Sequence, residues 1–353
     1  MELTLVQTVL LSLLIAIVFI LPLTLHKVEE NLEAFLFICG IGAVTVSHTW
    51  NWHLVKTALE DPIKITAAVL IAGLLFRQFH SQLQKLTQLA VKGLGLRWTL
   101  FSIVVILGLS SSIITAIIAA LILAEVTVML PLERRGRIKL VVFACYAIGM
   151  GAILTAIGEP LGTVVISKLS GAPHYAGFFY LIDHLGWYVL GGVLFMAGMA
   201  SSIREGTISH APGAKTVDTA NEHTVKSIFI RAGKVYLFVM ALTFLGDGLK
   251  PLALKTIIHL HAGWLYWINM LSAVLDNATL AAIEITPAIA DKTLTFLLVS
   301  LIISGGMLIP GNIPNIICAS KLGIKSKEWA QSAFGLGMAL MIAYFVILSA
   351  VLS

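Results

Sequence analysis

The chain has 353 residues, of which 58% are hydrophobic and only 12% are charged, and its mean hydropathy is +0.97. A soluble domain carries about 25% charged residues, so this composition excludes a soluble enzyme or binding domain and indicates an integral membrane protein. The net charge of +5 falls in short loops, which we interpret as a topology signal and not as a nucleic-acid surface.

The three cysteines, Cys39, Cys145 and Cys318, lie in apolar runs without the spacing of a metal site, so we expect neither disulfides nor a cofactor. The first apolar segments are residues 3–23, 33–46 and 63–76. Segment 3–23 lacks the basic region and cleavage site of a signal peptide. We assign residues 1–62 to N-terminal transmembrane helices and place the N-terminus outside.

Basic residues set the expected topology of the first half. By the positive-inside rule, residues 77–97 and 131–139 are cytoplasmic loops. The apolar segment between them must then leave and return on one side, as a re-entrant hairpin with its turn near Ser110, Ser111 and Ser112. The next helix is interrupted before Pro160, because proline removes a backbone donor and disfavours helix at the preceding residue.

The second half repeats this order from the opposite side of the membrane. After a cytoplasmic loop at 204–226, we expect a helix at 227–245, a hairpin at 264–287, and a helix interrupted at 310–315. An offset of 153 residues aligns the Ser-Lys-Leu sequences that contain Lys168 and Lys321, and it aligns Glu159 with Asn312.

The predicted fold is therefore an all-α polytopic membrane protein with two inverted repeats, residues 63–203 and 227–353. Each repeat contains a re-entrant hairpin and a discontinuous transmembrane helix. Broken helices in inverted repeats are typical of secondary transporters.

Asp276 is the strongest candidate for an ion-binding residue, because an ionisable group at membrane depth usually marks an ion or substrate pathway. Asp276, Asn277 and Thr279 offer carboxylate, amide and hydroxyl oxygens, the ligands that hard cations prefer. We expect Asp276 and Asn277 to bind sodium. The structural alternative is that this pair caps the start of a helix.

The remaining candidates carry side-chain oxygens near the other three breaks in the helices. They are Asn312, Asn315, Glu159, Thr155, Thr163, Ser110, Ser112 and Thr115. The serines have a structural alternative, since small residues also pack membrane helices closely.

Several other polar residues receive structural interpretations. Lys168 and Lys321 are expected to reach the membrane interface as anchors, with the alternative that either neutralises a carboxylate of the site. Glu125 and Glu284 are expected to pair with basic residues or to end near water. The Asp183-His184 pair has no third metal ligand nearby in the sequence.

The segment SAVLDNAT, residues 272–279, resembles the Ser-x-x-x-Asp-Asn-x-Thr hairpin motif of sodium/proton antiporters in the ion transporter superfamily. That superfamily also includes arsenite pump membrane subunits and dicarboxylate/sodium symporters. Gly158-Glu159 and Gly311-Asn312 resemble the two broken helices of the antiporters. More narrowly, the segments IPGNIPN and SSIITAIIAALILAE are similar to an uncharacterised bacterial and archaeal family that is predicted to transport cations. The first hairpin has Ile114-Thr115 in place of the Asp-Asn pair.

The pattern and the resemblance together predict a secondary active transporter in the cell membrane, the inner or plasma membrane. It would exchange sodium or another monovalent cation for protons by an elevator or rocking mechanism of alternating access. Asp276 would bind the cation or the proton, and Glu159 would be the second titrating group.

The expected partners are sodium, protons, the lipid bilayer and a second copy in a homodimer, with no nucleic acid and no cofactor beyond a bound sodium ion. The alternative is a sodium-coupled transporter of a small anion, such as a carboxylate, sulfate or another oxyanion. The lack of Arg or Lys in the predicted site argues against that alternative. The sequence contains neither a HExxH nor a Gly-x-Ser-x-Gly motif, and we do not expect an enzyme.

Overall fold

The computed structural model describes residues 3–25, 27–28, 31–204, 225–257, 262–275 and 277–352. Asp276, the side chain of Thr279 and most of the predicted loop at 204–226 lie outside the described residues. The described chain is helical, without a β-strand. Five helical segments are long and apolar enough to cross a membrane: Leu5–Pro22, Lys85–Ile114, Tyr180–Ser201, Ala232–Leu252 and Ser326–Val351. The protein is therefore an all-α membrane protein, as predicted.

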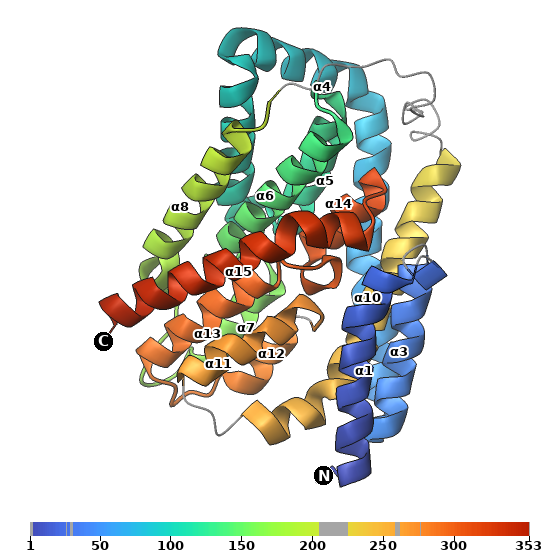
Figure 1. The fold of residues 1–353 in the computed structure, drawn as a ribbon, viewed down its shortest axis with the longest axis vertical. Helices are drawn as coiled ribbons and strands as arrows, with labels where there is room; N and C mark the ends of the chain where they lie inside the picture. The colour runs from blue at the N-terminus through green and yellow to red at the C-terminus, as the bar shows by residue number, and fades with distance from the viewer. Residues whose placement is uncertain are drawn as a thin grey trace.

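One group of helices contains α1 (Leu5–Thr24), α3 (Leu32–Ser47), α10 (Val225–Ile257) and the first part of α4 (Trp52–Ile114). These helices lie side by side in Figure 1, and α10 packs along both α3 and α4. A small separate core of Val44, Leu54, Ala58 and Phe244 holds α3, α4 and α10 together. We call these helices the first group.

Helix α4 arches over one end of the molecule and joins the two groups of helices (Figure 1). Its direction changes at Gly95, where φ is +75°, a conformation that a side chain disfavours. The prediction of a separate helix at 63–76 followed by a loop at 77–97 was wrong. Lys and Arg form helices well, so the basic residues continue the helix to the bend.

The second group begins with the last part of α4 and includes α5 (Ala116–Met129), α6 (Arg134–Ala152), α8 (Tyr180–Ser201) and α15 (Ser326–Val351). Helices α4 and α6 touch where Gly151 meets Gly108. A Cβ atom on Gly151 would overlap the carbonyl oxygen of Gly108, so the absence of side chains brings the two backbones into contact.

Two helices of the second group are interrupted where the sequence predicts. Helix α6 ends at Ala152, and its continuation α7 (Pro160–Lys168) begins only after an irregular segment. Helix α13 (Asp291–Ser304) is followed by the short 3₁₀ helix η2 (Ile309–Gly311) and then by α14 (Ile313–Leu322).

Two compact turns pack beside these interruptions. Helix α5 folds back on α4 at Thr115, whose φ is +76°. The turn is not at Ser110–Ser112 as predicted, because the Ser111 and Ser112 hydroxyls donate to carbonyl oxygens of α4 and stay within the helix. In the second half, α11 (Ala262–Ile268), η1 (Asn269–Ala273) and α12 (Asn277–Glu284) follow one another before α13.

The two halves of the chain exchange contacts in the centre of the second group. Helix α5 packs against α14, and α7 packs against α12. Each half therefore places its compact turn beside the interrupted helix of the other half.

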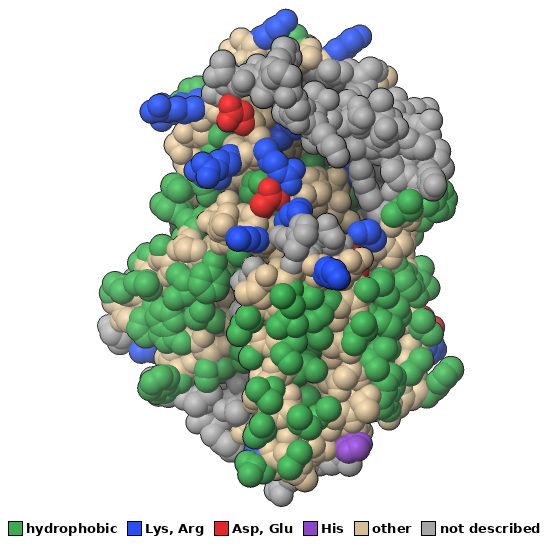
Figure 2. Space-filling view, turned by 45° about the vertical axis from the view of Figure 1, so that its right-hand side comes forward, with side chains coloured by type: hydrophobic (Ala, Val, Ile, Leu, Met, Phe, Trp, Pro, Cys, Tyr) green, Lys and Arg blue, Asp and Glu red, His purple; other side chains and the backbone are tan. Residues whose placement is uncertain are grey.

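The basic loops gather at one end of the molecule. Figure 2 shows Lys and Arg side chains at that end, and a face covered with hydrophobic side chains away from it. Arg134 donates to the carbonyl oxygen of Gly323 and to Glu328, which brings the predicted loops at 131–139 and near 321–327 together. The positive-inside rule assigns both loops to the cytoplasmic side, and it therefore requires that they lie at the same end of the molecule.

Candidate functional site

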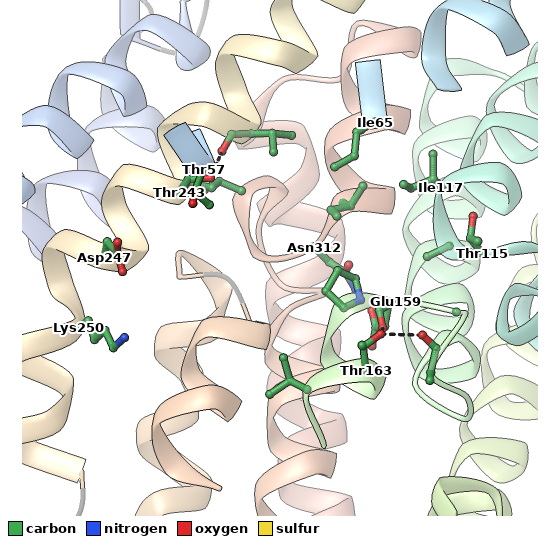
Figure 3. A pocket seen from close by; sticks show the side chains of 18 of the residues that line it. Thr57, Ile65, Thr115, Ile117, Glu159, Thr163, Thr243, Asp247, Lys250 and Asn312 are labelled. Atoms are coloured by element: carbon green, nitrogen blue, oxygen red, sulfur yellow. Dashed lines mark hydrogen bonds between the residues drawn. The ribbon is translucent and has the colours of Figure 1, made fainter. Parts of the chain in front are cut away.

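A cavity of about 1150 Å³ separates the two groups of helices. Its wall on the second group carries polar side chains from the two interrupted helices and the turn after α4: Thr115, Glu159, Thr163 and Asn312. The opposite wall carries polar side chains from α4, α10 and the segment before α4: Thr49, Asn51, His53, Thr57, Thr243, Asp247 and Lys250. Figure 3 shows both walls.

Glu159 occupies the position just before α7, with an extended backbone (φ −155°, ψ 162°), and Pro160 follows as the first helical residue. Proline suits that position because the N–H it lacks has no partner within the helix. The Glu159 side chain is only 6% exposed. The amino end of α7 carries a partial positive charge, which stabilises a nearby negative charge.

Asn312 occupies the same position in the second interrupted helix. It precedes α14 with nearly the same backbone conformation (φ −153°, ψ 146°). Its side chain is 8% exposed and lies against Gly149, where a Cβ atom would come within 2.7 Å of Asn312 Nδ2. Figure 3 shows the Glu159 and Asn312 side chains at the wall of the cavity. The residues that precede α7 and α14 thus line the same cavity.

Thr155 holds the first interruption in shape. Its hydroxyl donates to the carbonyl oxygen of Ser112 and accepts from the N–H groups of Ile157 and Gly158, at 3.2 and 3.3 Å. The carbonyl oxygen of Gly158 accepts from Ala116 N at 2.9 Å. These bonds join the interruption to the turn after α4. The Thr155 hydroxyl forms all three of its hydrogen bonds with backbone groups.

Thr163 and Thr115 line the cavity with hydroxyl groups. Thr163 Oγ1 donates to the carbonyl oxygen of Ala156 at 2.6 Å, which leaves its lone pairs available to a ligand. Thr115 Oγ1 accepts from Ile118 N at 3.4 Å. Neither Ser110 nor Ser112 is among the described residues that line the cavity.

The second interruption is held by Asn315, which is fully buried. Its Nδ2 donates to the carbonyl oxygens of Gly305 and Leu308, both at 2.9 Å. Asn315 therefore plays the structural part that Thr155 plays in the first half. Asn277 begins α12 and is also buried, and its amide nitrogen has no hydrogen-bond acceptor among the described residues.

The structure thus brings four predicted site residues to one cavity wall: Thr115, Glu159, Thr163 and Asn312. It places Thr155 and Asn315 behind that wall as supports for the backbone. The described residues do not include Asp276, so the structure does not relate it to this cavity.

The opposite wall of the cavity was not predicted from the sequence. Asp247 and Lys250 lie there on α10, although α10 is far from α7 in the sequence. The polar Gly-Asp-Gly sequence inside an apolar helix was a signal for this position, but it was not sufficient to relate it to Glu159. Lys250 lines this cavity, although the site predicted from the sequence contains no Arg or Lys.

The sequence model of a family described as "protein of unknown function (DUF1646)" matches residues 7–351. No curated protein matches the chain.

Proposed function

Because the chain belongs to the DUF1646 family, whose description assigns no function, we propose a function from the site itself: secondary active exchange of a monovalent cation, foremost sodium, for protons. The observation that carries this proposal is that the buried carboxyl group of Glu159 and the buried amide of Asn312 line the same cavity wall.

The oxygen atoms at this wall suit a hard cation. Glu159 supplies a carboxylate, Asn312 an amide oxygen, and Thr163 and Thr115 hydroxyl oxygens, which are the ligands that such ions prefer. We retain Asp276 as a second carboxylate of the proposed site on the basis of the sequence, where it precedes Asn277. A carboxylate removed from water is neutralised by a proton or by a bound cation, and this competition couples the two fluxes.

Alternating access is supported by the relation between the two halves. Glu159 and Asn312 have nearly the same backbone conformation, and the halves pack crosswise through α5 with α14 and α7 with α12. We assign the compact turns to re-entrant hairpins of two inverted repeats in a multi-pass protein of the cell membrane. The first group would be the fixed part, in a homodimer, and the second group would move past it across the cavity.

The test is exchange by the purified protein in liposomes. A sodium gradient should drive proton efflux, and both Glu159→Gln and Asp276→Asn should abolish it. Glu60→Gln is a suitable control, because Glu60 is exposed on α4 and pairs only loosely with Lys56, at 3.8 Å. Full exchange by both site variants would contradict the proposal.

The alternative cargo, a small carboxylate or sulfate carried with sodium, is favoured by one observation. Lys250 lines the cavity, and the amino ends of α7 and α14 also face it. Both features attract anions. Sodium-dependent uptake of labelled succinate or sulfate that is lost in Lys250→Gln would support this reading over cation exchange.

A further inference from the structure

A carboxyl group that the proposed exchange does not use is buried at the end of α12. Both carboxyl oxygens of Glu284 are inaccessible to water, and neither accepts a hydrogen bond from a described residue. No ion pair joins Glu284 to another described residue. A bare carboxylate in this position is costly, because burial removes its hydration and nothing replaces it.

The polar neighbour of this carboxyl group is Asn269 of η1. One N–H of the Asn269 amide donates to Ser300 Oγ at 2.9 Å, and the Ser300 hydroxyl in turn donates to the carbonyl oxygen of Leu297. The second N–H of the amide remains for the Glu284 carboxyl group. Asn269 Oδ1 has no partner among the described residues. The O–H of a protonated carboxyl group can satisfy this buried acceptor and a carboxylate cannot, which favours a proton on Glu284.

The equivalent part of the first half shows how an acid is neutralised there. Glu125 on α5 is buried and pairs directly with Lys321 of α14. Lys168 of α7, which occupies the same place as Lys321 in the repeated Ser-Lys-Leu sequence, does not do this. Its Nζ donates to the backbone carbonyl oxygens of Ala282 and Ile285, on either side of Glu284.

We propose that Glu284 is a second proton-binding residue of the transporter, separate from Glu159. This inference rests on the proposed exchange function. Glu284 holds its proton in the conformation described here and releases it to water when α12 moves. Only the carboxyl O–H bond breaks, and Lys168, already bound to the same turn, supplies the compensating positive charge.

The elements that pack against α12 are α7, α10, α13 and η1. Lys168 from α7 and Asn269 from η1 are the described groups whose contacts reach this turn. Helices α10 and α13 contribute no ion pair to Glu284 among the residues described. The protonation of Glu284 is therefore expected to depend mainly on burial and on Lys168.

The test measures protonation directly and does not require transport. Infrared difference spectra between acidic and alkaline pH, recorded on the purified protein in lipid, should contain the stretching band of a protonated carboxyl group. Glu284→Gln should remove this band, and Glu284→Asp should retain it with a shifted pH midpoint. Glu159→Gln and the exposed control Glu60→Gln should both keep it.

The outcomes separate this inference from the proposed function. A band that is unchanged in both Glu284→Gln and Glu284→Asp would overturn the role of Glu284, whatever the transport assay shows. If Glu284→Gln removes the band but Glu159→Gln still exchanges ions, the two conclusions separate. The buried proton on Glu284 is then supported, and the proposed function is contradicted. In liposomes, Glu284→Gln should lower the number of protons moved per sodium ion.

Discussion

Lys321 on α14 forms an ion pair with Glu125 on α5, and 196 residues separate the two in the sequence. The side chains are 13% and 3% exposed. The pair joins the turn of the first half to the interrupted helix of the second half, which also carries Asn312 at its amino end. Helix α14 therefore connects the cavity wall, through Asn312, to the ion pair with the first half, through Lys321.

Removal of one partner of this pair should strongly destabilise the protein, because the other charge remains buried. We expect Lys321→Met or Glu125→Gln to lower the free energy of unfolding by about 3–5 kcal/mol. The double variant Glu125→Leu/Lys321→Met should recover most of this loss. Thermal and denaturant unfolding in detergent, followed by circular dichroism, measures both effects. A double variant as unstable as the single variants would show that the pair has another role.

The exposed pair of Arg134 and Glu328 should behave differently. Arg134 donates to both carboxylate oxygens of Glu328, at 2.7 and 2.8 Å, but the two side chains are 51% and 29% exposed. Solvent screens such pairs, so Glu328→Gln should cost less than about 1 kcal/mol. The same unfolding experiments compare it with Glu125→Gln. A loss as large as that of Glu125→Gln would contradict this expectation.

The sequence was sufficient for the fold class and for the interrupted helices. Composition indicates a membrane protein, and prolines inside apolar segments mark the breaks before Pro160 and near Pro314, since proline lacks the N–H that a helix interior needs. The equivalent places of Glu159 and Asn312 were also visible, because both follow a glycine at the same offset from a Ser-Lys-Leu sequence.

The features that the sequence did not predict depend on contacts between distant segments. The basic stretch 77–97 was predicted to be a loop, and it is a helix that bends at Gly95. The turn at Thr115 was predicted near Ser110, Ser111 and Ser112. The positions of Lys321 beside Glu125 and of Lys250 at the cavity require the packed structure. Lysines were therefore interpreted as interfacial anchors, although one of them is paired inside the protein.

The contact between α4 and α6 should not tolerate a side chain. A Cβ atom in Gly151→Ala would overlap the Gly108 carbonyl oxygen, and the backbones would have to separate at a cost of about 1–3 kcal/mol. Gly198→Ala is a matched control on α8, because nothing lies within 4 Å of the added atom, and it should be neutral or stabilising by up to ~1 kcal/mol. Thermal unfolding and the yield of monodisperse protein measure the difference. Equal stability of the two variants would mean that the helices do not touch at this point.

The hydroxyl of Thr155 should be necessary for the first interruption. Thr155→Val keeps the shape of the side chain but leaves the N–H groups of Ile157 and Gly158 and the carbonyl oxygen of Ser112 without their partner. Each buried unsatisfied group costs about 1–3 kcal/mol. Thr155→Val should therefore lower both stability and exchange, whereas Thr155→Ser should retain both. Loss of function in Thr155→Ser as well would show that the hydroxyl group alone is not sufficient, and full function of Thr155→Val would contradict its role.

Two charges on the opposite wall of the cavity should report the sign of the transported ion. Asp247 and Lys250 lie three residues apart on α10 and line the same cavity as Glu159. For a cation, Asp247→Asn should raise the KM and Lys250→Gln should lower it, each by about two- to tenfold, because a wall charge changes the local concentration of an ion of either sign. For an anion the two changes should be reversed.

The changes in KM should become smaller at high ionic strength, since salt screens charges in a water-filled cavity. A change in KM that does not depend on salt would indicate that the wall residue binds the ion directly. The initial rate of exchange over a range of sodium concentrations measures both KM values. Glu60→Gln is the control for removal of a charge that does not line the cavity, because Glu60 is an exposed residue of α4.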